Sequence, residues 1–265
     1  MDSEIKKLFF AFEIMAPWPT EYPKGRLLAA ESRHLTLAFL GNVNYFELKM
    51  ILPEFPPLPF QVGPVGVFNK VLFLPPRRPH VVAWHSELDA AQPLNEYYHQ
   101  LIHWLTDHHY RVDERDFLPH VTIARSPFVI NEWRKSFFPI PMAITGLHLY
   151  ESVGNLIYTP IWTYPLLSPF QELDHTADIA FLIRGETIEK LHFNAQIALA
   201  FKHSPMLPFI HVDHLESNLD DLIISLNALI SRVDCEIGSP FKAVSFHGDL
   251  QEENHILKWE MIVDV

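Results

Sequence analysis

The sequence contains a single cysteine, Cys235, among its 265 residues. One cysteine can form neither an internal disulfide nor a cysteine-based zinc site. Glycine is also scarce, at nine residues, and neither a P-loop nor a G-x-G-x-x-G dinucleotide fingerprint is present. No apolar run is long enough for a transmembrane helix, and the short run after Lys6 and Lys7 does not suit a signal peptide. These absences predict a cytoplasmic globular protein.

Charge and proline are unevenly distributed along the chain, which carries a formal net charge of −12. Residues 1–168 contain 14 Lys and Arg against 16 Asp and Glu, together with 18 of the 22 prolines. Residues 169–265 contain 6 Lys and Arg against 16 Asp and Glu, so most of the net negative charge belongs to them. This change of composition indicates two domains, 1–168 and 169–265. The first is close to neutral, and the second is strongly acidic.

The pattern of apolar residues predicts a mixed α+β fold. In the first half, alternating apolar runs predict strands at 8–13, 34–40, 80–88, 118–124 and 147–150, and a helical period predicts a helix over 92–109. In the second half we expect a strand at 179–183, helices beginning at 187 and 219, and closing strands at 242–246 and 258–263. Asn44 and Thr187 are expected to cap helices with their side-chain oxygens.

The local pattern H-x-T occurs twice, as His34-Leu35-Thr36 and as His120-Val121-Thr122. Residues i and i+2 of a strand point to the same side, so each triplet presents one imidazole and one hydroxyl together. Two such strands side by side would suit phosphate-ester chemistry, with one imidazole as base and the other as acid. By count alone the signal is weak, because a buried strand histidine bonded to a backbone carbonyl is common.

Four segments in order resemble the 2H phosphoesterase superfamily, and within it the LigT-like RNA 2′,3′-cyclic phosphodiesterases. They are KLFFAFE at 7–13, HLTLAFLG at 34–41, FLPHVTIAR at 117–125 and LYES at 149–152. The resemblance covers about residues 6–168. It implies two similar α+β lobes related by a pseudo-twofold, with one H-x-T from each lobe facing a central cleft.

The resemblance also implies a reaction and roles for the motif residues. A 2′,3′-cyclic phosphate at an RNA 3′ end would be opened to a 2′-phosphate without a cofactor, and the reverse reaction would form a 2′-5′ RNA linkage. His34 would be the proton donor to the leaving oxygen and His120 the acceptor that activates water. Thr36 and Thr122 would bind the phosphate. Arg125 follows the second motif and is a further candidate for phosphate binding, with a surface role as its alternative.

The acidic second half shows a separate resemblance, to archease, an activator of RtcB-type RNA ligases. The segment ELDHTADIA at 172–180 resembles its opening, and 259–265 its closing strand. The resemblance implies a small α+β domain, shortened by part of its sheet, with a Ca²⁺ or Mg²⁺ site formed by Asp178, Asp264 and Val265. Carboxylates and a chain terminus can form such an oxygen-only site, and a helix cap with a frayed tail is the alternative.

These resemblances leave three functions open. The first is an RNA-end-processing phosphodiesterase joined to a module linked to RNA ligation and tRNA splicing. The second is a non-catalytic regulator or activator of an RtcB-type ligase, whose first half binds cyclic-phosphate ends without turning them over. The third keeps the two-histidine cleft but takes another substrate, a 2′-5′ oligoadenylate linkage or an ADP-ribose cyclic phosphate. No membrane partner is expected.

Overall fold

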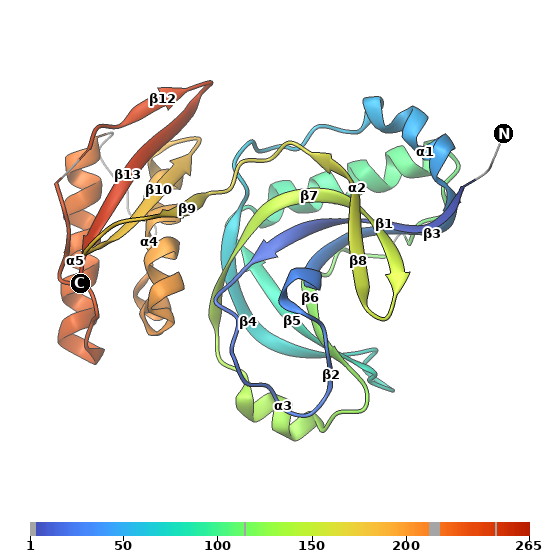
Figure 1. Cartoon of the computed structure of the whole chain (residues 1–265), viewed down its shortest axis with the longest axis horizontal. Helices are drawn as coiled ribbons and strands as arrows, with labels where there is room; N and C mark the ends of the chain where they lie inside the picture. The colour runs from blue at the N-terminus through green and yellow to red at the C-terminus, as the bar shows by residue number, and fades with distance from the viewer. Residues whose placement is uncertain (1–3, 114, 212–217, 247) are drawn as a thin grey trace.

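The computed structural model describes residues 4–113, 115–211, 218–246 and 248–265 of the chain. Its strands form an eight-stranded antiparallel sheet in the first part of the chain and a five-stranded antiparallel sheet in the second. Figure 1 shows the two sheets side by side, each with its own helices. Among the residues described, no helix is long and apolar enough to cross a membrane.

The eight-stranded sheet follows a closed path. Its elements are β1 (Ile5–Met15), β2 (Arg26–Leu27), β3 (His34–Asn44), α1 (Tyr45–Ile51), β4 (Val65–Leu74), β5 (Val81–Leu88), α2 (Ala91–Asp107), β6 (His120–Arg125), α3 (Ile130–Ser136), β7 (Ile140–Gly154) and β8 (Ile157–Tyr164), with 3₁₀ turns at Ala30–Ser32 and Leu52–Glu54. The strand order is β1-β3-β6-β5-β4-β7-β8, β2 pairs with β6, and β1 pairs with β7 as well. The central strands β3 and β6 therefore have neighbours on both sides.

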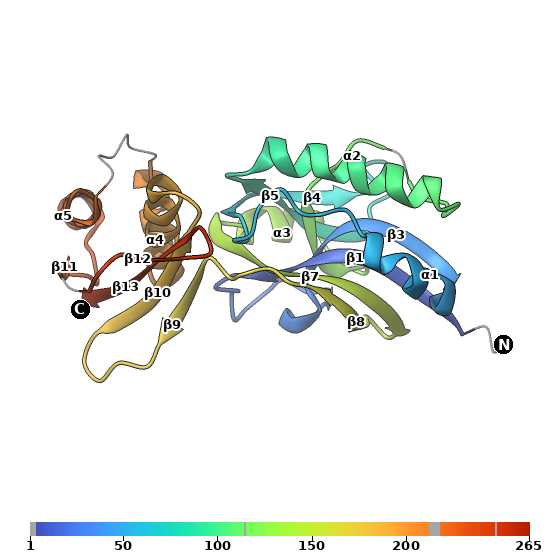
Figure 2. The same ribbon diagram turned by 90° about the horizontal axis from the view of Figure 1, so that it is seen from above.

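The alternation of residues along β3 decides which side chains face the core. Leu35 and Leu37 are buried, whereas His34 and Thr36 point to the opposite face. The helix α2 lies over the buried face and contributes an apolar stripe that includes Leu94 and Leu101 (Figure 2). The helices thus cover one face of the sheet, and the H-x-T side chains lie on the other.

The five-stranded sheet is built from β9 (Phe170–Leu173), β10 (Ile179–Gly185), β11 (Ala243–Val244), β12 (Gln251–Glu253) and β13 (Ile256–Asp264), and its helical segments are α4 (Ile188–Lys202), a 3₁₀ helix (Ser204–Phe209) and α5 (Leu219–Ile237). The order is β11-β13-β10-β9, with β12 paired to β13. Both expected caps are confirmed. Thr187 Oγ1 accepts the backbone N–H of Lys190 at 3.3 Å, and Asn44 Oδ1 accepts that of Phe46 at 3.1 Å.

Several expected strand boundaries are wrong. The strand expected at 118–124 begins only at His120, because Pro119 has no N–H for a ladder. The strand expected at 242–246 contains two paired residues, and the backbone of Val244 is bonded to the Asn227 side chain instead of to a further strand. The apolar pattern also did not indicate β4, where a register shift between Phe68 and Lys70 breaks the alternation, or β8 and β9.

The two parts of the chain are in direct contact. Val65 and Ala143 of the first sheet are buried in the apolar core of the second part. The Glu186 carboxylate accepts backbone N–H groups of Gln61 and Val62, the second at 3.2 Å. An ion pair between Lys190 and Asp89 lies at the same junction. Apolar and polar contacts therefore both join the two parts.

Candidate active site

The two H-x-T triplets lie side by side in the sheet. Leu35 of β3 and Val121 of β6 are paired residues of antiparallel strands, and both are fully buried. In such a pairing the flanking residues meet in reverse order, so His34 lies beside Thr122 and Thr36 beside His120. All four of these side chains are partly exposed on the open face. The fold therefore brings together the four residues that the sequence singled out.

Each histidine is oriented by a backbone carbonyl two residues earlier. His34 Nδ1 lies 2.8 Å from the Ser32 oxygen, and His120 Nδ1 lies 2.7 Å from the Leu118 oxygen. A carbonyl oxygen only accepts, so each Nδ1 carries a hydrogen and each Nε2 is left for chemistry. The two imidazoles thus have the same tautomer and the same local geometry.

The outer neighbours of the two triplets are alike beside the threonines and different beside the histidines. Ala11 of β1 pairs with Thr36, and Ala83 of β5 pairs with Thr122, so a small side chain flanks each hydroxyl. Glu13 of β1 pairs with His34, whereas His85 of β5 pairs with His120. Local symmetry therefore ends at the histidines, where one has a carboxylate neighbour and the other an imidazole.

His34 is enclosed by aromatic rings. Its ring centroid lies 4.7 Å from that of Phe9, 4.8 Å from Tyr158 and 5.7 Å from Tyr150. Burial, with smaller contributions from His120 and Arg125, lowers the pKa of His34 to about 4, and only the Ser32 carbonyl acts in the opposite direction. In the free protein His34 is therefore neutral at pH 7.

A cleft of about 620 Å³ opens between β2, β6 and the β7–β8 turn, lined in part by Lys7, Arg26, Arg125 and Tyr158. Arg26 and Arg125 are paired residues of β2 and β6, so their side chains lie on the same face. In the part of the chain that the structure describes, Lys7, Arg26 and Arg125 form no ion pair, and Arg125 Nε is buried without a hydrogen-bond partner. Unpaired cations around a hollow suit an anionic ligand.

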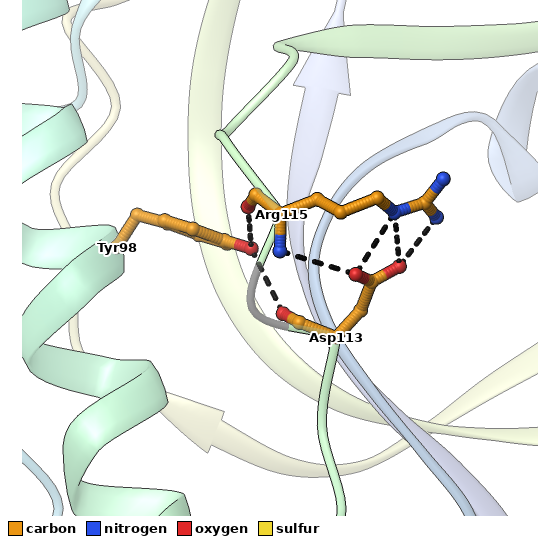
Figure 3. Close-up of polar contacts among 3 residues, drawn as sticks. All are labelled: Tyr98, Asp113 and Arg115. Carbon is orange, nitrogen blue, oxygen red and sulfur yellow. Dashed lines mark hydrogen bonds and ion pairs between the residues drawn. The ribbon is translucent and has the colours of Figure 1, made fainter.

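The segment that leads into β6 is anchored to α2. The Tyr98 hydroxyl donates to the carbonyl oxygens of Asp113 at 3.2 Å and Arg115 at 2.9 Å (Figure 3). The side chains of Asp113 and Arg115 form an ion pair with each other. The Tyr98 ring also stacks on Phe117 at 4.8 Å. These contacts hold the chain three residues before His120.

A second polar cluster lies on the same face beside His34. Glu13 Oε2 accepts the Thr145 hydroxyl at 3.0 Å and lies 3.7 Å from Nε2 of His148, whose Nδ1 is 2.9 Å from Thr163 Oγ1. The His148 imidazole, more than the Thr145 hydroxyl, holds the pKa of Glu13 below its usual range. Glu13 is therefore ionised at neutral pH and engaged by β7.

The expected cation ligands of the second part come together incompletely. Ile179 of β10 pairs with Val263 of β13, so Asp178 and Asp264 lie at the same end of neighbouring strands. That end of the sheet therefore carries two carboxylates.

The third expected ligand is engaged differently. The backbone oxygen of Val265 accepts the Lys242 ammonium, and Asp264 Oδ1 accepts the Ser245 hydroxyl at 3.2 Å. Within the described ranges, no group of three or more His, Cys, Asp and Glu side chains is placed to hold a metal ion. An ammonium beside the third oxygen repels a divalent cation, so these residues do not fit a closed metal site.

The sequence did not single out several residues of this face, among them His85, Arg26, Phe9, Tyr150 and Tyr158. They reach the H-x-T triplets through strand pairing, and a single sequence carries no signal for that register. For Phe9, His85 and Tyr150 the strand itself was predicted, at 8–13, 80–88 and 147–150, but its pairing was not.

Comparison with protein families gives a match over much of the first part. Residues 20–156 match the family described as the 2′-5′ RNA ligase superfamily. An RNA 2′,3′-cyclic phosphodiesterase of Thermotoga maritima is 29% identical over 137 residues, which are 47% of this chain and 69% of that protein. The family match ends before the second part of the chain begins.

Solved structures also resemble the first part. E. coli LigT complexed with 3′-AMP aligns at 24% identity, covering 62% of this chain and 99% of that one, with a TM-score of 0.47. TT0787 of Thermus thermophilus aligns at 17% identity, covering 60% and 96%, with a TM-score of 0.43.

Proposed function

Because the chain belongs to the 2′-5′ RNA ligase superfamily, we propose that it hydrolyses 2′,3′-cyclic phosphate ends of RNA to 2′-phosphates. Its relative in Thermotoga maritima bears the name of this activity. The observation that carries the proposal is the pairing of β3 with β6 through Leu35 and Val121, which sets two imidazoles and two hydroxyls on one open face. Two imidazoles with available Nε2 atoms supply an acid and a base.

The proposed reaction is a displacement at phosphorus. The water oxygen bonds to phosphorus while the bond from phosphorus to O3′ breaks. His120 Nε2 accepts a proton from the water, and His34 Nε2 donates one to O3′. Thr36 and Thr122 donate hydrogen bonds to the non-bridging oxygens, and Arg125 offsets their charge. The products are a 2′-phosphate and a free 3′-hydroxyl. In 2′-5′ ligation, the minor reaction, an RNA 5′-hydroxyl replaces water as the nucleophile and the P–O3′ bond breaks in the same way.

The donor role requires His34 to gain a proton when substrate binds. Burial holds the pKa of the free protein's His34 at about 4, so the imidazole is neutral before binding. A phosphate anion seated beside it favours the charged form and raises that pKa. Binding of the substrate phosphate thus favours the protonated form of His34, which acts as the acid.

The surrounding side chains fit a nucleotide end. Lys7 and Arg26 line the cleft beside Arg125 and can follow the phosphates of the preceding nucleotides. Phe39, paired with Phe9 across the strands at a ring distance of 5.5 Å, is 61% exposed and offers a flat face to a base.

The test is a product assay on RNA ending in a 2′,3′-cyclic phosphate, with a chelator present and 2′- and 3′-phosphates resolved. Wild type is expected to release only the 2′-phosphate, while His34→Ala and His120→Ala lose at least a hundredfold in kcat. His103→Ala is the control, because that histidine is exposed on α2. Full activity in either motif variant would refute the assignment. A panel that includes 2′-5′ oligoadenylate and ADP-ribose cyclic phosphate identifies the substrate class.

A second candidate function is regulation of an RtcB-type RNA ligase by residues 169–265, whose segments 172–180 and 259–265 resemble archease in sequence. Asp178 and Asp264 lie at one end of the sheet, but with Val265 they do not fit a closed metal site, so this candidate rests on the sequence resemblance. A ligase whose turnover is unchanged by the full chain, at every cation concentration, would remove this candidate.

A further inference from the structure

His85 is a further histidine on the open face of the first sheet, next to His120. Its residue pairs with His120 across β5 and β6, so the two side chains are direct cross-strand neighbours on one face. On the other side of β5 it pairs with Lys70 of β4. The four residues Thr36, His120, His85 and Lys70 therefore form one row across the sheet.

The hydrogen bonds of His85 fix its tautomer. Glu87 Oε2 accepts the side-chain nitrogen of Asn69 at 2.6 Å, and a carboxylate can only accept. The amide oxygen of Asn69 is thereby turned toward His85, whose Nδ1 lies 2.8 Å away. Nδ1 must carry the hydrogen, and Nε2 of the neutral ring is an acceptor.

The charges around His85 keep it in this form. Burial lowers its pKa, and Lys70 on β4 and His120 on β6 act in the same direction, while Glu87 on its own strand opposes them. Lys70 itself has three donors and no acceptor. His85 thus supplies an acceptor beside His120.

A water that attacks phosphorus has two O–H groups to place. His120 takes the proton of one, and the other needs an acceptor if the oxygen lone pair is to point at phosphorus. Building on the proposed function, we propose that His85 is a water-positioning residue, whose Nε2 accepts the second O–H of the attacking water. That second proton stays on the new phosphate oxygen when the P–O3′ bond breaks. Glu13, the matching neighbour of His34, lies beside the donor instead.

The test uses a nucleophile with one O–H. In water–methanol mixtures the same site can transfer the phosphate to water, giving a 2′-phosphate, or to methanol, giving a methyl 2′-phosphodiester. Methanol gives its single proton to His120 and has none left for His85. In His85→Leu we expect hydrolysis to fall at least tenfold in kcat with KM unchanged, and methanolysis to be retained. The ratio of methyl ester to 2′-phosphate therefore rises about tenfold.

Three further variants sharpen the result. His85→Gln keeps a side-chain acceptor and should restore much of the hydrolysis. Asn69→Leu removes the acceptor that keeps the hydrogen on Nδ1 of His85. It should raise the ratio of methyl ester to 2′-phosphate less than His85→Leu does. His80→Leu removes an exposed histidine just before β5 and should leave the ratio and kcat unchanged.

The outcomes separate the two proposals. A ratio unchanged in an active His85→Leu means that the residue acts only through structure, and it overturns the water-positioning role alone. If wild type makes no methyl ester, a fall in hydrolysis of less than threefold overturns it, and a tenfold fall rescued by His85→Gln supports it. If wild type releases no product from any cyclic-ended RNA, the proposed function fails, and this inference with it.

Discussion

The His34 imidazole lies in an environment much less polar than water. Its Nδ1 is bonded to a carbonyl and its faces are covered by Phe9, Tyr150 and Tyr158. The burial disfavours the charged ring and, against the opposing effect of the Ser32 carbonyl, lowers its pKa to about 4. The unfolded chain, in contrast, binds this proton near pH 6.5.

The same shift makes stability depend on pH. Below pH 6.5 the unfolded state binds a proton on His34, whereas the folded state binds it only near pH 4. The contribution of neutral His34 to the free energy of unfolding is therefore complete above pH 6.5 and is lost as pH falls toward 4. We expect the free energy of unfolding of wild type to fall by about 2–3 kcal/mol more than that of His34→Gln between pH 7 and pH 4.5. Urea unfolding at a series of pH values measures both. Parallel curves for the two proteins would contradict the shift, and exposed His103→Gln should follow wild type.

Phe39 is an aromatic side chain that the core does not use. It is 61% exposed and touches the ring of Phe9, which in turn contacts His34. Stacking of one base on an exposed ring contributes about 1–3 kcal/mol. We expect Phe39→Ala to raise KM for cyclic-ended RNA about tenfold or more with kcat nearly unchanged. Phe46→Ala, at 59% exposure on α1, is the matched control, and equal KM values in the two variants would show that Phe39 does not bind the base.

At the scale of elements, the connection from α2 to β6 determines where His120 stands. The Tyr98 hydroxyl holds two carbonyls of this connection, as Figure 3 shows. Tyr98→Phe removes those bonds and keeps the stacking on Phe117. We expect the free energy of unfolding to fall by about 1 kcal/mol and kcat to fall several-fold, because a small misplacement of a catalytic group is costly.

The neighbouring tyrosine of α2 provides the comparison. The Tyr97 hydroxyl is bonded to the Pro56 carbonyl, 3.3 Å away and outside this connection. Tyr97→Phe should therefore lose similar stability and keep its kcat, as steady-state kinetics on the two purified variants will show. A kcat lowered equally in both would mean that the connection does not position His120.

The two-residue alternation of apolar side chains sets how much of the H-x-T site the sequence could predict. The H-x-T strands have a clear alternation, so their two-residue period alone places His34 with Thr36 and His120 with Thr122 on common faces. The strand β4 escaped prediction because a bulge at Asn69 breaks its alternation.

Register is the information that a single sequence does not hold. That β3 lies against β6, and β5 beyond it, depends on pairings between residues far apart in the chain, and Glu13, His85 and Arg26 enter the site only through them. The expected cation site shows the converse. Strand pairing brings Asp178 toward Asp264, but the Lys242 ammonium beside Val265 follows from a contact that spacing does not reveal.

At the scale of the whole molecule, most of the net negative charge belongs to residues 169–265, whereas the cationic cleft is lined by residues of the first part. The two parts are nevertheless joined by shared apolar burial of Val65 and Ala143 and by the Glu186 carboxylate. A protein with a common core of this kind unfolds as one unit for as long as the junction holds.

The junction therefore sets the cooperativity of unfolding. Glu186→Ala leaves the backbone N–H groups of Gln61 and Val62 without their acceptor, and Val62 is buried, so we expect a loss of about 2 kcal/mol. Glu186→Gln keeps an accepting oxygen and should lose less than half as much. In urea, wild type is expected to unfold in one transition by circular dichroism, and Glu186→Ala in two, because the parts then separate before either melts. A single transition at the wild-type midpoint in Glu186→Ala would show that the apolar contacts alone couple the two parts.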